Sequence, residues 1–345
     1  MNNVLFYSLL ADWYSHHRRE LPWRETSDPY AIWLSEIILQ QTRVEQGIGY
    51  YYRFLRTFPT VELLASAHED EVLRLWQGLG YYTRARNLHK AAQQIVAEGN
   101  GFPDTYERLR TMPGVGAYTA GAIASFAYNL PYPALDGNVY RVLSRLTNCS
   151  IAFDSTEGKK HFHHVAEQLL DRAHPGVFNA AIMEFGALYC TPHHPDCMHC
   201  AIAGFCHAYE QGTVENLPVR KPRPKLKNRY FLYSIYIDYS GNTMIHQRQE
   251  KDIWHHLYEF PLIEFSDEKT WIDAAHQLVS KGRLLGPLVH QLSHQRLHAR
   301  AIVYRVQKLP SIADTKIISF RHIDDYALSR LNLKILELLP NWQKD

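Results

Sequence analysis

No stretch of the 345-residue sequence approaches the roughly 18 uninterrupted apolar residues of a membrane-spanning helix. The apolar start, Val4 to Ala11, lacks the basic flank and the small-residue cleavage site of a secretory signal. With 18 glycines and 17 prolines, 46% hydrophobic residues and 21% charged residues, the composition excludes a collagen-like or disordered chain. We therefore expect a globular protein with a sizeable core, located in the cytoplasm and without a membrane partner.

The sequence also lacks a net charge of one sign, because 37 Lys and Arg residues oppose 35 Asp and Glu residues, for a formal charge of +2. This balance neither demands nor excludes a nucleic-acid partner, so DNA binding must be argued from local patches. Residues 220–229 hold six cations and no acid, although a solvated linker stiffened by two prolines explains them as well. A second patch brackets two tyrosines and is more suggestive; its cations are Arg74, Arg84, Arg86, His89 and Lys90.

Cysteine is scarce, with five residues, yet four of them lie within 17 positions: Cys190, Cys197, Cys200 and Cys206. A cytoplasmic chain keeps its thiols reduced, so clustered cysteines indicate metal ligands before disulfides. Four thiolates suit either tetrahedral zinc or an iron–sulfur cluster. Zinc sites usually combine two close pairs, and the single close pair here favours iron–sulfur, with zinc as the alternative. The fifth cysteine, Cys149, is expected to be a small buried residue.

We expect a first, all-helical domain over residues 1–216. Apolar residues recur there at helical spacing, and prolines and glycines separate the periodic stretches. The expected helices cover residues 4–17, 30–40, 44–58, 84–98, 139–146 and 156–170.

The pattern changes after a basic, proline-containing linker at residues 217–228. Residues 229–345 are predicted to form a smaller α+β domain, because aromatic and β-branched residues replace the helical periodicity. A turn at residues 240–242 predicts a hairpin of strands 230–238 and 243–248. Further strands are expected at 286–293 and 297–307, and helices at 270–279 and 327–339.

Residues 109–121 contain the run Pro113-Gly114-Val115-Gly116. A glycine pair around a small apolar residue lets two helices join through a tight turn, and the backbone N–H groups that start the next helix can grip a phosphate. This pattern is typical of a helix-hairpin-helix motif, although an ordinary turn between helices explains it equally well when it stands alone. Such a loop needs no positive side chain to bind DNA, in keeping with the near-neutral charge.

Two carboxylates have suggestive positions. Asp136 precedes the helix expected at 139–146 as an N-cap would, and a helix N-terminus keeps a carboxylate ionised. Glu36 lies on a largely apolar stripe with Ile32 and Leu39, where desolvation would raise its pKa. A simple cap and an arginine partner are the structural alternatives for these two residues. Together they offer one carboxyl that holds a proton and one that stays charged, the division of roles in glycoside-cleaving sites.

The order and spacing of these motifs resemble those of the helix-hairpin-helix DNA glycosylases, and most closely the adenine DNA glycosylases of the MutY type. The resemblance covers residues 1–225 and extends, more weakly, to a C-terminal domain similar to the Nudix fold. It rests on Leu21-Pro22-Trp23-Arg24, Glu36 to Thr42, Gln77 to Leu88, Pro113 to Ala120, Leu135 to Val139 and the four cysteines. It implies a helical glycosylase domain with an iron–sulfur loop at 190–206, followed by a Nudix-like lesion-recognition domain.

The resemblance implies an enzyme of base excision repair that excises adenine paired with 8-oxoguanine or guanine. Its partner would be double-stranded DNA, its cofactor one 4Fe–4S cluster held by the four cysteines, and it would act as a monomer associated with the nucleoid. Glu36 would protonate adenine N7 and then handle water, and Asp136 would stabilise or trap the sugar cation. Tyr118 and Asn138 would hold that centre.

The resemblance also implies DNA contacts. Gln41 and Tyr81 would wedge into the base stack, where a flipped base leaves a gap to fill. Leu292, Ser293 and His294 match a Phe-Ser-His loop that recognises 8-oxoguanine, although the leucine departs from that pattern. The remaining expected contacts are Arg84, Arg86, Pro113, Gly114, Val115 and Gly116.

Two features separate the chain from related enzymes. Endonuclease III-type glycosylases nick the strand through a Schiff-base lysine, and Tyr118 stands at that place, which predicts a monofunctional glycosylase. A Nudix hydrolase needs a run of carboxylates that hold magnesium, and no such run follows Trp254 to Pro261. The other hypotheses are a non-catalytic iron–sulfur DNA-binding module, which would need neither Glu36 nor Asp136, and a nucleotide hydrolase, which the missing carboxylates oppose.

Overall fold

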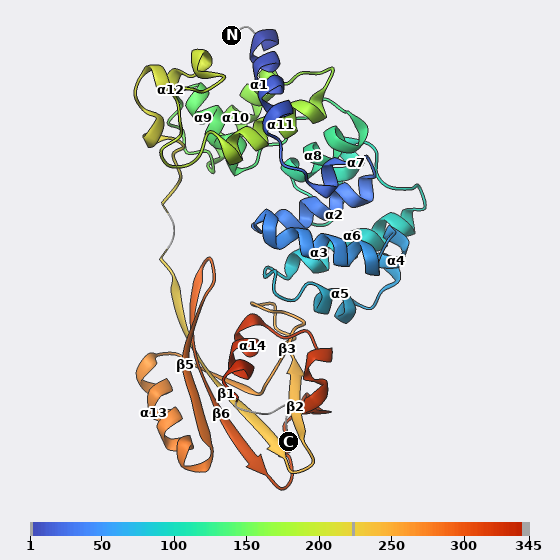
Figure 1. Cartoon of the computed structure of the whole chain (residues 1–345). Coiled ribbons are helices and arrows are strands. Elements are labelled where there is room, and N and C mark those ends of the chain that lie inside the picture. Colours follow the sequence, from blue (N-terminus) through green and yellow to red (C-terminus); the bar gives the residue numbers. More distant parts are fainter. Residues whose placement is uncertain (1–2, 223–224, 340–345) are drawn as a thin grey trace. The chain divides into compact units, whose positions relative to one another are not determined.

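The computed structural model describes residues 3–222 and 225–339 (Figure 1). Within them, the first of two compact units comprises residues 3–66 and 87–222, and the second comprises residues 67–86 and 225–339. The division after Pro222 falls inside the segment that we predicted as a linker, of which Arg223 and Pro224 lie outside the described residues. No pattern in the sequence indicates that residues 67–86 belong to the second unit.

The first unit is all-helical, as predicted. The six helices expected from the sequence begin and end within two residues of the observed bounds. The second unit holds α5 (Glu69–Leu75) and the start of α6 (Thr83–Glu98). The helices of the first unit are α1 (Asn3–His17), α2 (Pro29–Leu39), α3 (Val44–Thr57), α4 (Val61–Ser66), α7 (Tyr106–Thr111), α8 (Ala117–Tyr128), α9 (Gly137–Leu146), α10 (Thr156–Leu169), α11 (Pro175–Leu188) and α12 (His207–Glu210), together with most of α6.

Helix α2 runs through the core of the first unit. Asp28 caps it, because its carboxylate accepts hydrogen bonds from the backbone N–H groups of Tyr30 (3.1 Å) and Ala31 (3.2 Å). The residues from Tyr30 to Ile38 are all buried, since the helix is apolar on nearly every side and packs against α3 and α8. Glu36 is therefore carried into an apolar environment by the helix around it.

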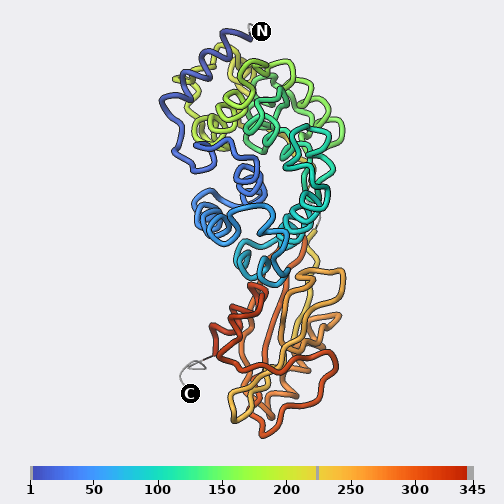
Figure 2. The backbone as a smooth tube through the Cα atoms, turned by 90° about the vertical axis from the view of Figure 1, so that its right-hand side faces the viewer, coloured from blue at the N-terminus to red at the C-terminus, as the bar shows by residue number. Residues whose placement is uncertain are grey.

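Helix α11 packs against α1, α8 and α9. At Gly186 the approach to α9 is so close that an added Cβ atom would lie 2.8 Å from the Cβ of Asn138 and 2.9 Å from its carbonyl oxygen. The N-terminal helix α1 lies beside the later part of the same unit (Figure 2), where the rings of Phe6 and Phe205 meet edge to face with centroids 5.6 Å apart. These contacts hold the start of α9 in a fixed position.

The second unit is built on two sheets. One is four-stranded, in the order β4 (Leu262–Phe265), β1 (Lys227–Asp238), β6 (Gln295–Val306) and β5 (Arg283–Gln291). The pairing of β1 with β6 is parallel, and the other two pairings are antiparallel. The second sheet is three-stranded and antiparallel, in the order β3 (Tyr258–Glu259), β2 (Asn242–Gln247) and β7 (Thr315–Ser319).

Two helices cover opposite faces of the four-stranded sheet (Figure 1). On one face, α13 (Glu268–Leu278) packs Trp271 and Ala275 against Leu232 and Ile302. On the other, α14 (Arg330–Glu337) contributes to a larger apolar core with β1, β5 and β6. This is the α+β architecture that the sequence predicted.

The predicted hairpin of residues 230–238 and 243–248 is wrong, because β1 and β2 lie in different sheets. The turn itself forms, and the Asp238 carboxylate accepts hydrogen bonds from the backbone N–H groups of Ser240 and Asn242, both at 2.8 Å. The carbonyl of Gly241 then accepts a hydrogen bond from the N–H of Phe320 at 2.8 Å. The turn thus places β2 beside β7, with which it pairs. This partner lies far along the chain, and local sequence patterns do not indicate it.

Within the described residues, no helix has the length and apolar character needed to cross a membrane.

Replacement of Gly186 by alanine is expected to destabilise the protein by about 1–3 kcal/mol, because the added Cβ would press against Asn138. Gly49 in α3 provides a matched control, since a Cβ there meets nothing within 4 Å. Gly49→Ala is expected to stabilise the helix by about 0.5–1 kcal/mol. Thermal unfolding of the wild type and both variants tests this, and an unchanged midpoint for Gly186→Ala would contradict the packing argument.

Candidate active site

A cavity of about 1030 Å³ lies in the first unit. Residues of α2, the turn after it, the start of α8, the start of α9 and α11 form its walls. All four side chains predicted to be catalytic line this cavity: Glu36, Tyr118, Asp136 and Asn138. The fold thus brings together residues from three helices that are well separated in the sequence.

Glu36 is 5% exposed. Burial raises the pKa of its carboxyl from the usual 4.5 to about 7; a hydrogen bond from Tyr118 lowers it, the charge of Asp136 raises it and Arg24 lowers it. The atom Oε2 has no hydrogen-bond partner among the described residues. The expectation that desolvation raises the pKa of this residue is therefore confirmed.

Asp136 is the N-cap of α9, as predicted. Its carboxylate accepts a hydrogen bond from the backbone N–H of Val139 and another from the amide of Asn138, each at 2.8 Å. Burial nevertheless raises the pKa of Asp136 above its ordinary value, against these hydrogen bonds and the charge of Arg141, which lower it. The sequence indicated the stabilising helix N-terminus but not the burial that opposes it.

Tyr118 and Asn138 complete this group. Burial, followed by the charges of Glu36 and Asp136, raises the pKa of Tyr118 well above its ordinary value, so its hydroxyl stays protonated and donates a hydrogen bond to Glu36. Asn138 donates to Asp136 through its amide nitrogen, and its amide oxygen accepts a hydrogen bond from Arg141 at 2.9 Å. Each carboxyl therefore has one neutral side-chain donor beside it.

Helix α9 connects this cavity to the cysteine-rich loop. Arg141 donates a hydrogen bond to the carbonyl of Cys190 at 2.8 Å, and Arg145 donates to the Sγ atom of the same residue at 3.3 Å. Arg145 is 1% exposed and also donates to the carbonyl of Thr191 at 2.7 Å. The cap of α9 thus lies at the cavity, and the following turns of the helix hold the loop.

The four clustered cysteines line one small cavity of the first unit together with Arg145. Burial raises the pKa of Cys200 to about 12, and it also raises the pKa values of Cys197 and Cys206, with further contributions from neighbouring thiols. Four sulfur donors around one space fit an iron–sulfur cluster or zinc. Yet no three His, Cys, Asp or Glu side chains in the described part of the chain converge as metal ligands. The four thiols nevertheless share one cavity, and each can reorient by rotation about a single side-chain torsion.

A second buried glutamate, which we did not predict from the sequence, lies in the cavity wall. Glu184 on α11 is fully buried, and its carboxylate pairs with Arg19 and Arg24, each at 2.8 Å. Burial would raise the pKa of Glu184, but the hydrogen bonds from both arginines hold it at about 2. An acid inside the apolar run of α11 was the available signal, and its partners lie 160 or more positions away in the sequence.

The predicted helix-hairpin-helix turn joins α7 to α8. Gly114 has φ of +78°, and a Cβ there would lie 2.9 Å from the Cβ of Asn87, so the turn requires glycine. Gly116 is the N-cap of α8 and is exposed, as is Gly114, whereas the side chain of Val115 is buried. Of this run, Pro113 is half-buried. Any phosphate contact here would therefore come from backbone N–H groups.

Gln41 and Tyr81, the expected wedge residues, share an unusual backbone conformation. Gln41 is exposed at the rim of the cavity and has φ of 58°. Tyr81, in the second unit, is 48% exposed and has φ of 47°. Such left-handed conformations are costly for residues other than glycine and collect at functional positions. Both side chains are thus presented to solvent by strained turns.

Arg84, one of the expected DNA contacts, is buried in the second unit. Its guanidinium donates hydrogen bonds to the carbonyls of Leu79 (3.1 Å) and Gly80 (3.3 Å) and lies 5.0 Å from the ring of Trp76. Burial lowers the pKa of Arg84 to about 10. These contacts support the turn that carries Tyr81, and the contact of Arg84 with DNA stays a prediction.

Arg86 is half-buried and also has partners inside the second unit. Its guanidinium donates to the carbonyl of His255 at 2.6 Å and to the hydroxyl of Thr83 at 3.1 Å. In this structure the cation therefore connects the start of α6 to the loop before β3.

The expected lesion-recognition residues form the tip of the β5–β6 hairpin. Leu292 is half-buried against the apolar core, and its backbone N–H donates to the carbonyl of Gln295 at 2.8 Å. Ser293 and His294 are exposed, and the Ser293 hydroxyl lies 3.2 Å from Nδ1 of His294. The leucine thus anchors the turn, while the two polar side chains are available to a ligand.

Two family models match the chain. Residues 34–168 match the HhH-GPD superfamily of base excision DNA repair proteins, and residues 232–338 match the NUDIX domain. The first match includes Glu36, Tyr118, Asp136 and Asn138. The second covers most of the α+β part of the second unit.

Individual relatives agree with these models. The adenine DNA glycosylase of Buchnera aphidicola subsp. Baizongia pistaciae is 35% identical over 312 residues, which cover 90% of this chain and 88% of that protein. That of Mus musculus is 44% identical over 228 residues, 62% of this chain and 44% of the mouse protein. A solved thermostable thymine-DNA glycosylase has a TM-score of 0.55 at 27% identity, covering 61% of this chain and 97% of its own. The chain belongs to the adenine DNA glycosylase family and is an enzyme of base excision DNA repair.

Proposed function

We propose that this enzyme hydrolyses the N-glycosidic bond of adenine paired with 8-oxoguanine or guanine in duplex DNA and leaves the strand intact. The observation that carries the proposal is the presence of two carboxyl groups in unlike environments in one cavity. Glu36 has a pKa raised to about 7, and Asp136 accepts two hydrogen bonds of 2.8 Å that favour its charged form. Acid-assisted cleavage of a glycosidic bond requires such a pair.

Glu36 is the general acid in this proposal. Adenine is a poor leaving group as an anion, and a proton delivered to its N7 atom lets it depart as a neutral base. With a pKa of about 7, a large share of Glu36 carries that proton at neutral pH. Once ionised, the same carboxylate can accept a proton from the attacking water, while Tyr118 keeps it oriented through its hydrogen bond.

Asp136 stabilises the positive charge that develops on the sugar as the bond breaks. Its negative charge is supported by the N-terminus of α9 and by the amide of Asn138. Because the site is buried, the attraction between this carboxylate and the sugar cation is stronger than it would be in water. Attack by water, or transient bonding to Asp136 followed by water, then completes the hydrolysis.

The substrate must leave the duplex to reach this cavity. Flipping a base costs a few kcal/mol, and side chains that fill the gap reduce the loss of stacking. We assign this role to Gln41 and Tyr81, which are both exposed on strained turns. A cavity of about 1030 Å³ is spacious enough for a purine. The turn at 113–116 would hold a backbone phosphate through its N–H groups.

Cys190, Cys197, Cys200 and Cys206 would hold a 4Fe–4S cluster. The cluster supplies a structural cross-link when bound, because four thiolate ligands leave no iron site open to substrate. Arg145, by its contacts with Cys190 Sγ and the Thr191 carbonyl, would connect that cross-link to α9. We therefore expect loss of iron to loosen the support of Asp136.

The absence of a lysine at position 118 underlies the prediction of an intact strand. A lyase needs an amine that forms an imine with the sugar, and the Tyr118 hydroxyl cannot form one. In the second unit, the exposed pair Ser293 and His294 would read 8-oxoguanine opposite the target adenine, with Leu292 as their anchor.

The proposal is tested by single-turnover assays on a duplex with adenine opposite 8-oxoguanine, quenched with and without hot alkali. Wild-type enzyme should yield strand breaks only after alkali. Glu36→Gln should abolish base release, because the amide cannot donate the proton, while duplex affinity stays within about tenfold of wild type. Strand breaks without alkali would reject the monofunctional assignment, and no adenine release by the wild type would reject the proposed function.

The pH dependence of the chemical step follows from the two carboxyl groups. Glu36 acts in its protonated form, so the single-turnover rate should be full below pH 7 and fall as the pH rises through its pKa of about 7. At low pH the rate should fall again as Asp136 becomes protonated, and burial moves this limb above the ordinary range of an aspartate. A rate that rises through pH 7 would contradict the assignment of Glu36 as the acid.

The recognition turn is tested by the double variant Ser293→Ala, His294→Ala. Removal of both exposed polar groups should reduce the rate on adenine opposite 8-oxoguanine by roughly tenfold and change the rate opposite guanine much less. His322→Ala, which removes another exposed histidine of the same unit, is the control and should change neither rate. Equal losses on both substrates would show that the turn does not read the lesion.

A further inference from the structure

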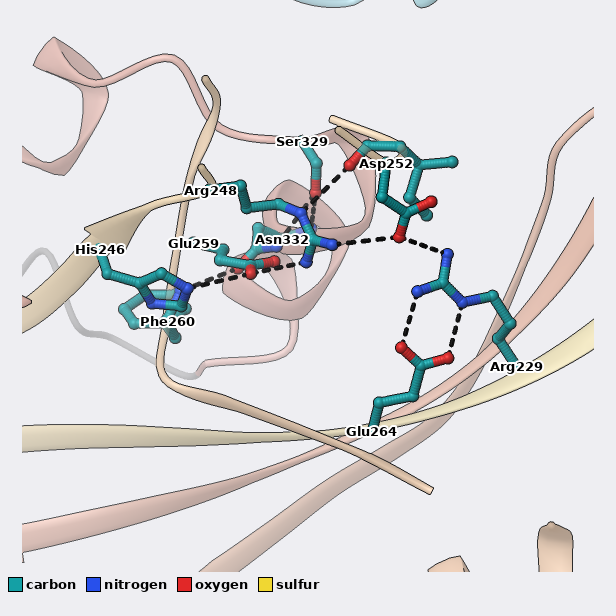
Figure 3. Close-up of polar contacts among 10 residues, drawn as sticks. Arg229, His246, Arg248, Asp252, Glu259, Phe260, Glu264, Ser329 and Asn332 are labelled. Atoms are coloured by element: carbon teal, nitrogen blue, oxygen red, sulfur yellow. Dashed lines mark hydrogen bonds and ion pairs between the residues drawn. The ribbon is translucent and has the colours of Figure 1, made fainter. Parts of the chain in front are cut away.

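Residues 248–257 connect β2 to β3, and the part from 249 to 257, here called loop 249–257, is held at its base by a cluster of charged side chains (Figure 3). Asp252 lies 2.7 Å from a guanidinium nitrogen of Arg229 and 3.4 Å from one of Arg248. Arg229 also pairs with Glu264 on β4 through two hydrogen bonds of 2.7 and 2.6 Å. Arg229 lies on β1 of one sheet, Arg248 directly follows β2 of the other, and both are largely buried, so the loop is fixed to both sheets.

The far part of this loop has a strained backbone. Trp254 has φ of 59° and His256 has φ of 66°, although neither is glycine. Such conformations persist where surrounding contacts determine them, and they collect at functional sites. The ring of Trp254 lies 5.9 Å from the ring of His290 on β5, the strand that ends at the recognition turn 292–294. One side of the loop therefore contacts the strand that presents the recognition turn.

The other side of the loop contacts residues 67–86, which belong to the same unit. Nδ1 of His256 pairs with Glu69 on α5 at 2.5 Å, and the carbonyl of His255 accepts the hydrogen bond from Arg86. Beyond the loop, the hydroxyl of Tyr258 donates to Asp70 at 3.2 Å. Glu69 and Arg86 thus lie on either side of Tyr81 in the sequence, and both are bound to the loop.

We propose that loop 249–257 is a positioning element for base-pair specificity, which holds the wedge Tyr81 and the recognition turn 292–294 in one fixed relation. The loop contacts Glu69, Arg86 and His290, the first two in the segment of Tyr81 and the third on the strand of the turn. Because Tyr81 and the recognition turn are held together, they would enter the duplex as one body. The base that the turn contacts would then determine the position of Tyr81 in the base stack. This inference rests on the proposed function.

The test compares the ratio of single-turnover rates on adenine opposite 8-oxoguanine and adenine opposite guanine. Glu69→Ala removes the partner of His256 and suits the α5 helix, and it should lower this ratio at least about threefold. Asp325→Ala breaks another pair of a histidine with an acid in the second unit, His322 with Asp325 at 3.1 Å, in which neither residue belongs to the loop, and should leave the ratio unchanged.

The decisive measurement repeats Glu69→Ala in a Tyr81→Ala background. If the loop acts by positioning Tyr81, Glu69→Ala should change the ratio by less than about 1.5-fold there, because the group being positioned is gone. An equal fall in both backgrounds, or no fall in the wild-type background, would overturn the inference while the proposed function stands. Failure of the wild type to release adenine from either duplex would instead reject the proposed function.

A second variant guards against a simple loss of folding. Tyr258→Phe removes one hydroxyl, which bonds to Asp70, and keeps the ring that packs edge to face against Tyr326. It should preserve the thermal midpoint and lower the ratio in the same direction as Glu69→Ala. A normal ratio for Tyr258→Phe combined with a lowered midpoint for Glu69→Ala would show that Glu69 has a merely structural role, and would overturn the inference.

Discussion

Desolvation of carboxyl groups in the core of the helical unit is the constraint on which the candidate site depends. Glu36 and Glu184 are both buried in the wall of one cavity, yet the pKa of Glu36 is about 7 and that of Glu184 is about 2. The difference lies in their partners: Glu184 is bound by the guanidinium groups of Arg19 and Arg24, whereas Glu36 has the neutral hydroxyl of Tyr118 and the distant charge of Arg24. Since removal of a charge from water is costly unless that charge is paired, a neutral partner leaves the proton on Glu36 and two cationic partners remove it from Glu184.

The helix α9 extends this constraint to the rest of the unit. Asp136 gains its hydrogen bonds because it caps α9, and α9 keeps its place because Arg141 and Arg145 bind the carbonyl groups and the Sγ atom of the cysteine-rich loop. Those arginines are themselves largely buried, and they are tolerated because several acceptors surround each guanidinium. The cavity, the cap and the loop are therefore one hydrogen-bonded assembly, in which the thiols lie at the opposite end from the carboxyl groups.

The parts of the fold that could be predicted from the sequence are those whose signals are local. Helices α2, α3 and α10 have apolar periodicity and clear ends, and Asp136 has the local environment of a cap, so their positions agree with the structure to within two residues. Features that depend on distant partners were missed or wrong. The hairpin of β1 and β2 fails because β7 is the partner of β2, and Glu184 needs arginines from the other end of the unit. Their physical causes are tertiary contacts, which a single sequence does not display.

The second unit is formed by two separate stretches of the chain, residues 67–86 and the C-terminal part. The proposed chemistry and recognition are therefore not divided at a single point of the sequence. Residues 67–86 interrupt the helical unit in sequence, but they contact the C-terminal part. Glu69 pairs with His256, Tyr82 donates a hydrogen bond to the Leu328 carbonyl, and Arg86 donates one to the His255 carbonyl. A cut at the linker would therefore leave Tyr81 in the helical fragment without the contacts that Glu69, Tyr82 and Arg86 make with the C-terminal part. Under the proposed function, loss of the C-terminal part would remove the recognition turn and also disturb the wedge, so truncation cannot separate these two proposed contributions. Point changes at the contacts of loop 249–257 separate them, because they leave both side chains in place and alter only the relation between them.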